Sequence, residues 1–386
     1  MRMKYVEGSC PKRRSIRPHA WVVILAGALV FGASWVEAQT TEEPVVEEPS
    51  EESSESAVPK ISIHGYLNQA YAVSDGNTLF GISEDGTADY RTAALQVRTE
   101  ISPNSTFALQ LSHERFGESE LQKFRDDVEL DWVFYQHRFG ATSIKVGRVQ
   151  IPFGIYNEVR DVGTLLPFYR PSSNFYGEGA YTSETVDGIL LSHRFELGAG
   201  WSLEGEVHYG DWQFIERSPD FVTREVNDSR GVELSLETPV PGLRVLVGGM
   251  RYDVGTGARD GATTWETYHV SLDANLGRFK AQAEYKYIDF VTGDYDAGYA
   301  LLGFAPLDRL TFYGQVDFAD LKVTGFREGD FDDEVVVGAS YAFRPDLVAK
   351  LESHWNEGYQ PEFPAQNFFA PKLKTRYLIL SLSASF

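Results

Sequence analysis

The fold of this chain is decided by its last residues, Tyr377-Leu378-Ile379-Leu380-Ser381-Leu382-Ser383-Ala384-Ser385-Phe386. Apolar side chains occupy every second position from 378 to 386, and the alternate positions carry mostly serine. A period of two residues places the apolar set on one face of a β-strand. A strand at the very end of a chain still has an edge that must pair, and the first strand of a closed sheet can supply the partner. The ending therefore predicts a β-barrel that the last strand closes.

The beginning of the chain has the pattern of a secretory signal peptide. Six basic residues precede or flank the start of an apolar run, Trp21 to Val36, which is too short for a membrane-spanning helix. Small side chains at Val36 and Ala38 predict cleavage after Ala38, so residues 1–38 are interpreted as the signal peptide. An uncleaved anchor helix is the alternative. The sole cysteine, Cys10, would leave with the signal, so the mature chain would contain no disulfide.

Residues 39–59 differ in composition from everything that follows. They are mostly Glu, Ser, Pro, Thr and Val, with no aromatic residue. Such a segment buries too little apolar surface to offset its chain entropy, so we expect a disordered acidic leader. A periplasmic tether is the alternative function for it.

The composition as a whole fits a membrane barrel. The chain contains 20 Tyr and 25 Phe, yet its mean hydropathy is slightly negative, at −0.28. This combination is typical of barrels in which alternate residues of each strand face water. The formal charge of −21 argues against nucleic acid as a partner, since that would require basic stripes.

From residue 60 to the end, the chain repeats a hairpin rhythm. About sixteen alternating segments occur, an even number typical of single-chain bacterial barrels. Short turns rich in Gly, Pro, Asn and Asp alternate with longer, mostly acidic connections, three of which follow segments 201–211, 278–290 and 309–318. We therefore predict an all-β fold, a transmembrane antiparallel barrel over residues 60–386. Both termini would lie on the rim of the short turns, which is the periplasmic rim.

The two faces of the predicted strands differ in polarity. Phe107, Leu109 and Leu111 share one face, which we assign to lipid. The opposite parity carries charged rows, namely Lys280, Gln282, Glu284 and Lys286, and Lys350, Glu352 and His354. Charged side chains at bilayer depth are tolerated only toward a wet or paired interior. A soluble β-sandwich is the alternative, but it would not confine its long loops to one rim.

One connection, from residue 151 to about Ser183, is longer and more apolar than the others. Its surroundings contain Gly147-Arg148, Pro152-Phe153-Gly154, Tyr156-Asn157-Glu158 and Arg160-Asp161, a pattern that resembles the phosphate-selective porin O and P family. The terminal Phe386 likewise resembles the assembly signal of outer-membrane barrels. These resemblances imply a bacterial outer-membrane porin whose third long loop folds into the lumen. They also imply a homotrimer, delivery by the barrel-assembly machinery, and contact with outer-membrane lipid and lipopolysaccharide.

We expect the charged residues of this region to form the pore constriction. Lys145, Arg148, Arg160 and Arg170 would face Glu158 and Asp161. Opposed charges make a transverse field that orients dipolar solutes, and arginine remains charged at any working pH. The alternative is that these arginines only pin the loop. These four basic and two acidic residues give segment 145–170 a net formal charge of +2, which predicts a weak anion preference at high salt.

The predicted function is passive diffusion of small hydrophilic solutes or ions, without catalysis, cofactor or bound metal. A phosphate- or anion-selective channel is one alternative. A barrel hydrolase that assembles His, Asp and Ser across strands is another, although no HExxH, Gly-x-Ser-x-Gly or phosphate-binding glycine loop occurs. Two acidic stretches, Asp294 with Asp296 and residues 328–333, are predicted as solvated outer loops. Divalent-cation binding is the alternative for them.

Overall fold

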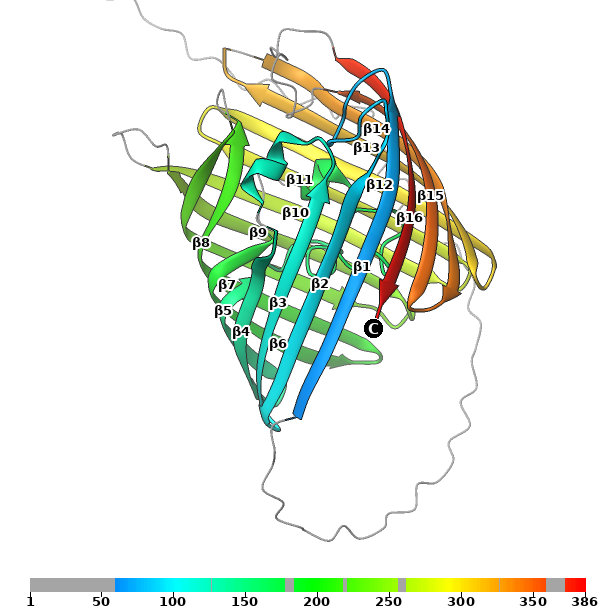
Figure 1. Cartoon of the computed structure of the whole chain (residues 1–386). Coiled ribbons are helices and arrows are strands. Elements are labelled where there is room, and N and C mark those ends of the chain that lie inside the picture. The colour runs from blue at the N-terminus through cyan, green and yellow to red at the C-terminus, as the bar shows by residue number, and fades with distance from the viewer. Residues whose placement is uncertain are drawn as a thin grey trace, which may run out of the picture.

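Sixteen antiparallel strands close into a single barrel in the computed structural model (Figure 1). The described residues are 60–125, 127–177, 184–217, 221–255, 262–325, 327–358 and 372–386. The predicted signal peptide and the acidic leader lie outside them. Among the described residues, no helix is long and apolar enough to cross a membrane. The predicted all-β class and the strand number are confirmed.

The strands follow the chain order around the barrel, and each pairs with its sequence neighbours. They are β1 (Lys60–Asp75), β2 (Thr87–Ser102), β3 (Ser105–Phe116), β4 (Glu129–Phe139), β5 (Thr142–Gln150), β6 (Thr185–Gly198), β7 (Trp201–Arg217), β8 (Phe221–Glu237), β9 (Leu243–Gly255), β10 (Ala262–Leu276), β11 (Phe279–Phe290), β12 (Gly293–Leu307), β13 (Leu310–Val323), β14 (Arg327–Arg344), β15 (Leu347–Gly358) and β16 (Leu373–Ser385). Two short helices lie in connections: η1 (Glu120–Phe124), a 3₁₀ turn, and α2 (Ser173–Tyr176).

The terminal strand closes the barrel, as its alternation predicts. β16 pairs with β1 from Tyr66 opposite Ser385 to Asp75 opposite Arg376. The pairing continues past the strand end, because the Phe386 N–H donates to the Gly65 carbonyl at 3.0 Å and the Gly65 N–H donates back at 3.1 Å. The last residue of the chain is therefore part of the ladder that joins the two ends.

Deleting Phe386 should sharply reduce the amount of heat-modifiable barrel in the outer membrane. The deletion removes two closing hydrogen bonds, each worth about 1 kcal/mol, together with an exposed aromatic ring at the rim. Semi-native electrophoresis of outer-membrane fractions measures the folded form. Phe386→Tyr is the matched control, since it keeps the backbone pairing and the aromatic ring. Normal levels of the deletion variant would contradict an assembly role for this residue.

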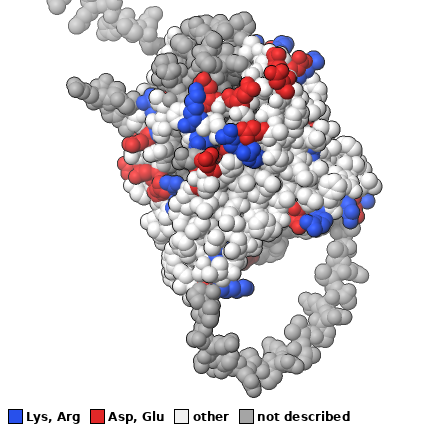
Figure 2. Space-filling view, in the orientation of Figure 1, with Lys and Arg blue, Asp and Glu red and all other residues white. Residues whose placement is uncertain are grey.

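An apolar band surrounds the barrel. Figure 2 shows an almost uncharged zone on the viewed face, with charges gathered above it toward the rim of the long connections and a few below it. The exposed large apolar side chains belong to the parity predicted to face lipid, including Phe107, Leu111, Val207, Val335 and Leu380. The rows at the opposite parity are buried, including Gln282, Glu284, Lys350, Glu352 and His354. An apolar outside and a polar inside are the pattern of a membrane barrel.

Three predicted long connections are wrong. Only residues 218–220 separate β7 from β8, only 291–292 separate β11 from β12, and only 324–326 separate β13 from β14. The acidic stretches that were predicted as outer loops therefore lie in β12 and β14. Charged residues take the place of apolar ones along these parts of the strands, so apolar alternation no longer marks them. Asp294 and Asp296 of β12 pair instead with Lys322 of β13, at 2.8 and 3.6 Å.

Candidate functional site

The connection between β5 and β6 makes an extensive set of contacts with the interior face of the barrel. Two backbone donors near its start reach carboxylates on distant strands. The Gly154 N–H donates to Glu233 Oε2 of β8 at 2.8 Å, and the Ile155 N–H donates to Glu284 Oε2 of β11 at 3.0 Å. Glu284 is fully buried and also accepts from the Tyr299 hydroxyl at 2.6 Å. Buried carboxylates require such partners.

A second set of anchors holds residues further along the same connection. Lys350 Nζ of β15 donates to the Phe168 carbonyl at 2.5 Å, and the Tyr169 N–H donates to Glu352 Oε1 at 2.6 Å. From β1, the Asn68 side-chain amide donates to the Tyr169 carbonyl at 3.1 Å. The charged rows that the sequence assigns to a wet or paired interior are thus paired with the backbone of one segment.

An apolar cluster lies between these anchors. Its members are Tyr156, Leu166, Phe168, Phe175 and Tyr176 of the connection, packed against Tyr299, Leu301 and Val336 of β12 and β14. The short α2 turn presents two of these aromatic rings, and its first turn is capped by Ser172 Oγ, which accepts from the Phe175 N–H at 3.3 Å. Polar and apolar contacts together order the segment 151–177, which we call the inner segment.

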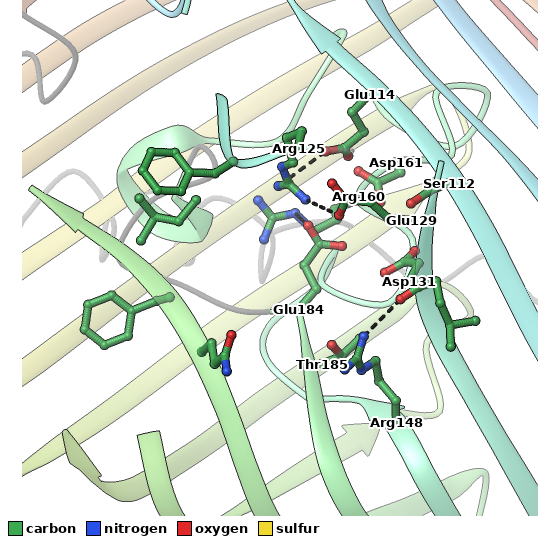
Figure 3. Close-up of a pocket in the computed structure, with 15 residues that line it drawn as sticks. Ser112, Glu114, Arg125, Glu129, Asp131, Arg148, Arg160, Asp161, Glu184 and Thr185 are labelled. Carbon is green, nitrogen blue, oxygen red and sulfur yellow. Dashed lines mark hydrogen bonds and ion pairs between the residues drawn. The ribbon is translucent and has the colours of Figure 1, made fainter. Parts of the chain in front are cut away.

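A charged cavity of about 200 Å³ lies on the part of the wall that the anchors do not use (Figure 3). The anchors described above lie on β1, β8, β11, β12, β14 and β15, whereas the cavity is lined from β3, β4, β5, β6 and β7. The inner segment and the residue that follows η1 complete its wall. Its lining residues are Ser112, Glu114, Phe124, Arg125, Glu129, Leu130, Asp131, Arg148, Arg160, Asp161, Glu184, Thr185, Gln213, Phe214 and Ile215.

Carboxylates outnumber guanidinium groups in this cavity by five to three. Arg125 lies 3.3 Å from Glu114 and 3.4 Å from Glu129, and Arg160 Nε lies 3.2 Å from Glu184. Figure 3 shows these side chains converging on one space from separate strands and from the inner segment. The formal charge of the cavity lining is therefore negative. Two of its three arginines, Arg125 and Arg160, already form ion pairs with carboxylates of the lining.

Three carboxylates stand especially close together. Single oxygens of Asp131, Asp161 and Glu184 all lie within 4.8 Å of one another. Burial, together with the negative charges of Glu184, Glu114 and Asp131, raises the pKa of Asp161 well above its ordinary value. Oxygen ligands at this spacing are of the type that a hard cation uses, while the adjacent Arg160 supplies a competing positive charge. The arrangement attracts positive charge and repels a further anion.

The predicted constriction residues lie in four places rather than one. Arg160 and Asp161 line the cavity. Lys145 Nζ lies 4.0 Å from Glu158 Oε1, and neither residue belongs to the cavity lining. Arg170 binds the hydroxyls of Tyr90 and Tyr377 at 2.7 and 3.5 Å and lies over the Phe80 ring. The six residues predicted as one group are therefore not brought together.

The partner predicted for Arg148 is wrong. Its guanidinium binds Asp187 of β6 at 2.8 Å and donates to the Leu130 carbonyl at 3.0 Å, not to Glu158 or Asp161. Arg148 has the strand parity of the exposed Val146, so its side chain leaves the sheet on the outer face while its base borders the cavity. The outward direction of Arg148 could have been predicted from the sequence, because Arg148 and Val146 are two residues apart on β5.

Arg160 acts as a brace within the inner segment. Its guanidinium donates to the carbonyls of Tyr176 at 3.3 Å and Gly177 at 2.9 Å, in addition to its ion pair with Glu184. The alternative that such an arginine pins the loop is therefore met at this position, and the same side chain also faces the cavity.

Most of the cavity's acidic residues were missed by sequence reasoning. Glu114, Glu129, Asp131 and Glu184 are spread over two strands and a connection, and only the fold of the barrel brings them together. One signal existed, since Asp131 interrupts the alternation of β4. The β3–β4 register shifts between Gln110 and Leu111, a β-bulge that leaves Asp131 without a ladder partner.

Comparison with known proteins supports the fold alone. No protein-family model matches the chain, and no curated protein matches it. OmpF of Salmonella typhi, solved in complex with daunomycin, has a TM-score of 0.60 at 12% identity, covering 85% of this chain and 98% of that chain. A loop L8 deletion mutant of OmpT, an outer membrane protein of Vibrio cholerae, has a TM-score of 0.56 at 11% identity, covering 85% and 99%. A trimer form of OmpT gives 0.54 at 10% identity, covering 86% and 100%.

The chain is a sixteen-stranded barrel of the outer-membrane type. Its apolar band and its closed sheet fit a bacterial outer membrane, and the similar solved structures include outer-membrane proteins. The resemblance to the phosphate-selective porin O and P family finds no support in these comparisons, because no family model matches and the solved structures named above are OmpF and OmpT.

Proposed function

We propose that the protein is a passive diffusion channel for small hydrophilic solutes and ions, without catalytic activity. In this proposal the inner segment folds into the lumen and narrows it. The charged cavity beside the inner segment then lines the remaining passage. The observation that carries the proposal is the anchoring of the inner segment to interior side chains of β8, β11 and β15, which leaves the β3–β7 side of the wall to the cavity.

The proposed selectivity is for cations rather than anions. The weak anion preference predicted from segment 145–170 considered that segment alone, whereas the cavity adds four carboxylates from elsewhere and has the balance of five to three. Charges beyond roughly 8 Å are largely screened at physiological salt, so the groups nearest the passage dominate. Arg170 and Lys145 lie outside the cavity lining, which removes two of the positive charges on which the anion prediction rested.

We also propose a homotrimer, surrounded by outer-membrane lipid and lipopolysaccharide and delivered by the barrel-assembly machinery. The solved trimer form of OmpT supports the oligomeric state, since it shares this fold.

A cysteine at the cavity tests the channel directly. The chain has a single cysteine, Cys10, within the predicted signal peptide, so Asp161→Cys would introduce a unique thiol into the mature barrel. In planar bilayers, a water-soluble thiosulfonate reagent should reduce the single-channel conductance of this variant, because the adduct occupies the passage. Val146→Cys is the matched control: its side chain is exposed on the lipid-facing parity, so the reagent should leave conductance unchanged.

The outcomes separate the proposed classes. Conductance without hydrolysis of peptide or ester substrates supports the channel. A barrel that hydrolyses such substrates and shows no conductance would support the hydrolase alternative. Equal block of Asp161→Cys and Val146→Cys, or no block of either, would show that the passage does not run beside the cavity.

A further inference from the structure

A cationic group interrupts the outer face of the barrel at the ends of β2 and β3. Asp89 and Arg91 of β2 share their parity with the exposed Leu95, and Arg115 of β3 shares its parity with the exposed Leu111. These side chains therefore leave the sheet on the lipid-facing side. Charged side chains on that side are unfavourable within the hydrocarbon layer but favourable near the lipid headgroups. The depth of these side chains in the membrane therefore determines whether they can contact headgroups.

The group lies near the upper edge of the apolar band. Along β3, Phe107 belongs to the aromatic rim of the short turns, and Arg115 follows it at roughly 26 Å along the strand, at about 3.3 Å per residue. With a strand tilt of about 40°, this distance corresponds to roughly 20 Å of height, close to the roughly 25 Å of the apolar band. Arg115 thus lies just inside the upper edge of the apolar band, from where its long side chain can extend to the headgroup level on the rim of the long connections.

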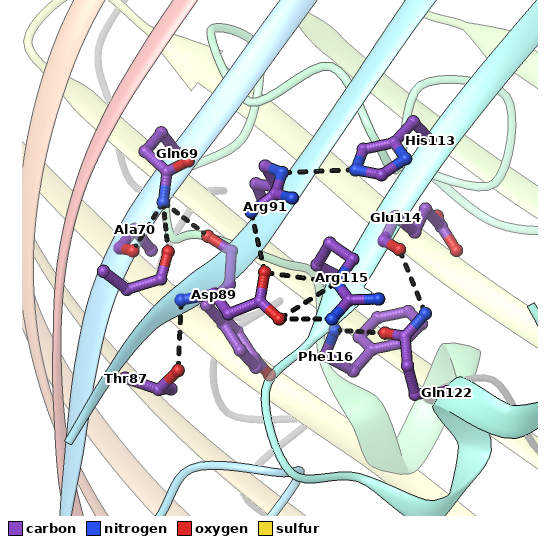
Figure 4. Close-up of polar contacts among 12 residues, drawn as sticks. Gln69, Ala70, Thr87, Asp89, Arg91, His113, Glu114, Arg115, Phe116 and Gln122 are labelled. Atoms are coloured by element: carbon purple, nitrogen blue, oxygen red, sulfur yellow. Dashed lines mark hydrogen bonds and ion pairs between the residues drawn. The ribbon is translucent and has the colours of Figure 1, made fainter. Parts of the chain in front are cut away.

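The two arginines share one carboxylate (Figure 4). Arg115 donates from Nε to Asp89 at about 3 Å, and Arg91 Nη1 donates to Asp89 Oδ1 at 2.8 Å. Arg91 Nε also donates to His113 Nε2 at 3.2 Å. Asp127 adds a negative charge near Arg115 but forms no ion pair with it within 4 Å among the described residues. The contact group itself has one more positive charge than negative.

Unused donors remain on both arginines. Among the described residues, Arg91 Nη2 and Arg115 Nη1 have no hydrogen-bond partner, and each side chain is 31% exposed. Two guanidinium groups are thus held by one shared carboxylate, and each keeps free N–H donors. Guanidinium matches phosphate geometry with two parallel hydrogen bonds, and rigid placement lowers the entropy lost on binding.

Two other charged groups on the outer face are arranged differently. Arg251 of β9 pairs with Glu266, and Lys322 of β13 meets both Asp294 and Asp296. Those groups are neutral or negative. In a chain with a formal charge of −21, a local positive excess with free donors requires a local reason.

We propose that Arg91 and Arg115 form a binding site for the phosphate of a glycolipid headgroup in the outer leaflet. The inference goes beyond the proposed channel, and it depends on the membrane orientation but not on conduction. Phosphate complements the positive excess, and the headgroup level places it beside the free guanidinium donors. The acyl chains of the same lipid would lie on the apolar band below, against residues such as Leu95 and Leu111.

Binding of lipid A to the folded barrel tests this site. The detergent-solubilised full barrel is titrated with lipid A, with dephosphorylated lipid A, and with inorganic phosphate alone. The wild type should prefer lipid A to its dephosphorylated form by at least roughly tenfold, the scale of one charge-assisted hydrogen bond. Arg91→Gln combined with Arg115→Gln should abolish this preference. Arg251→Gln, which removes an outer-face arginine from a neutral pair, should retain it.

Each outcome decides the proposal. Preference that survives in the double variant, or falls equally in Arg251→Gln, would overturn it. Inorganic phosphate that binds as tightly as lipid A would assign a free-anion site instead. Loss of oligomers in the double variant with lipid A preference intact would assign the group to a second copy of the chain. Heat-modifiability verifies folding. If the glutamine variant does not fold, Arg91→Lys combined with Arg115→Lys replaces it in the test. This lysine variant keeps the charge but loses the bidentate geometry, so it should bind lipid A with intermediate strength.

Discussion

Deleting residues 153–176 and joining the ends with a Gly-Ser linker should raise single-channel conductance severalfold while the barrel still forms. The strands hold one another through a closed ladder, which does not depend on this segment. Removing it leaves polar wall residues, including Glu233, Glu284 and Lys350, free to be solvated by water in a wider passage. Conductance in planar bilayers is the measurement, and heat-modifiability is the check on folding.

A milder variant provides a matched control. Glu284→Gln keeps the shape of the side chain and can still accept the Ile155 N–H, so conductance should change little. Unchanged conductance in the deletion variant would place the inner segment outside the lumen and would overturn the proposed constriction. A deletion variant that is absent from the membrane would instead show that the segment is required for assembly, and the glutamine variant then distinguishes the two roles.

Neutralising the cavity carboxylates should shift the reversal potential toward anions. The variant combines Asp131→Asn, Asp161→Asn and Glu184→Gln, which replaces three neighbouring carboxyl groups with neutral amides. A unit charge about 6 Å from a permeating ion changes its energy by roughly 0.7 kcal/mol in a water-like dielectric, about threefold in relative permeability per charge. The wild type should be cation-preferring in a salt gradient, and the triple variant should lose or invert that preference.

Two comparisons test the origin of the effect. Glu357→Gln on the outer face of β15 removes one carboxylate far from the cavity and should leave the reversal potential unchanged. Acidification of the wild type should mimic the triple variant in part. The pKa of Asp161 is raised, so its carboxylate takes up a proton at a higher pH than an ordinary aspartate as the pH falls. An anion-preferring wild type, or equal shifts in Glu357→Gln and the triple variant, would contradict the cavity as the selectivity filter.

The strand pattern could be predicted because the membrane imposes it locally. Lipid contacts Phe107, Leu111 and Leu380, whereas the residues next to them in sequence point to the interior. The alternation within each strand therefore shows which of its faces is the outer one. The same logic identified the charged rows of β11 and β15 as interior. It failed at the ends of β12 and β14, where charged residues replace apolar ones and residues 328–333 therefore resembled a loop.

The candidate site could be predicted only in part. Arg160 and Asp161 adjoin each other in sequence within an unusually apolar connection, which marked them. Glu114, Asp131 and Glu184 are remote in sequence and carry no local signal except the bulge at Asp131. The charge of the cavity is a sum over several strands, so a count along one segment omits four of its five carboxylates.

The sequence by itself determined that the chain forms a closed antiparallel barrel with an apolar outside, because alternation with a period of two is a property of single strands. Only the tertiary structure decided where the inner segment is anchored and which charges share the cavity. The pairings of Glu284 with the Ile155 amide and of Lys350 with the Phe168 carbonyl join residues more than a hundred positions apart. Such pairings depend on the curvature and register of the whole barrel, and no local period encodes them.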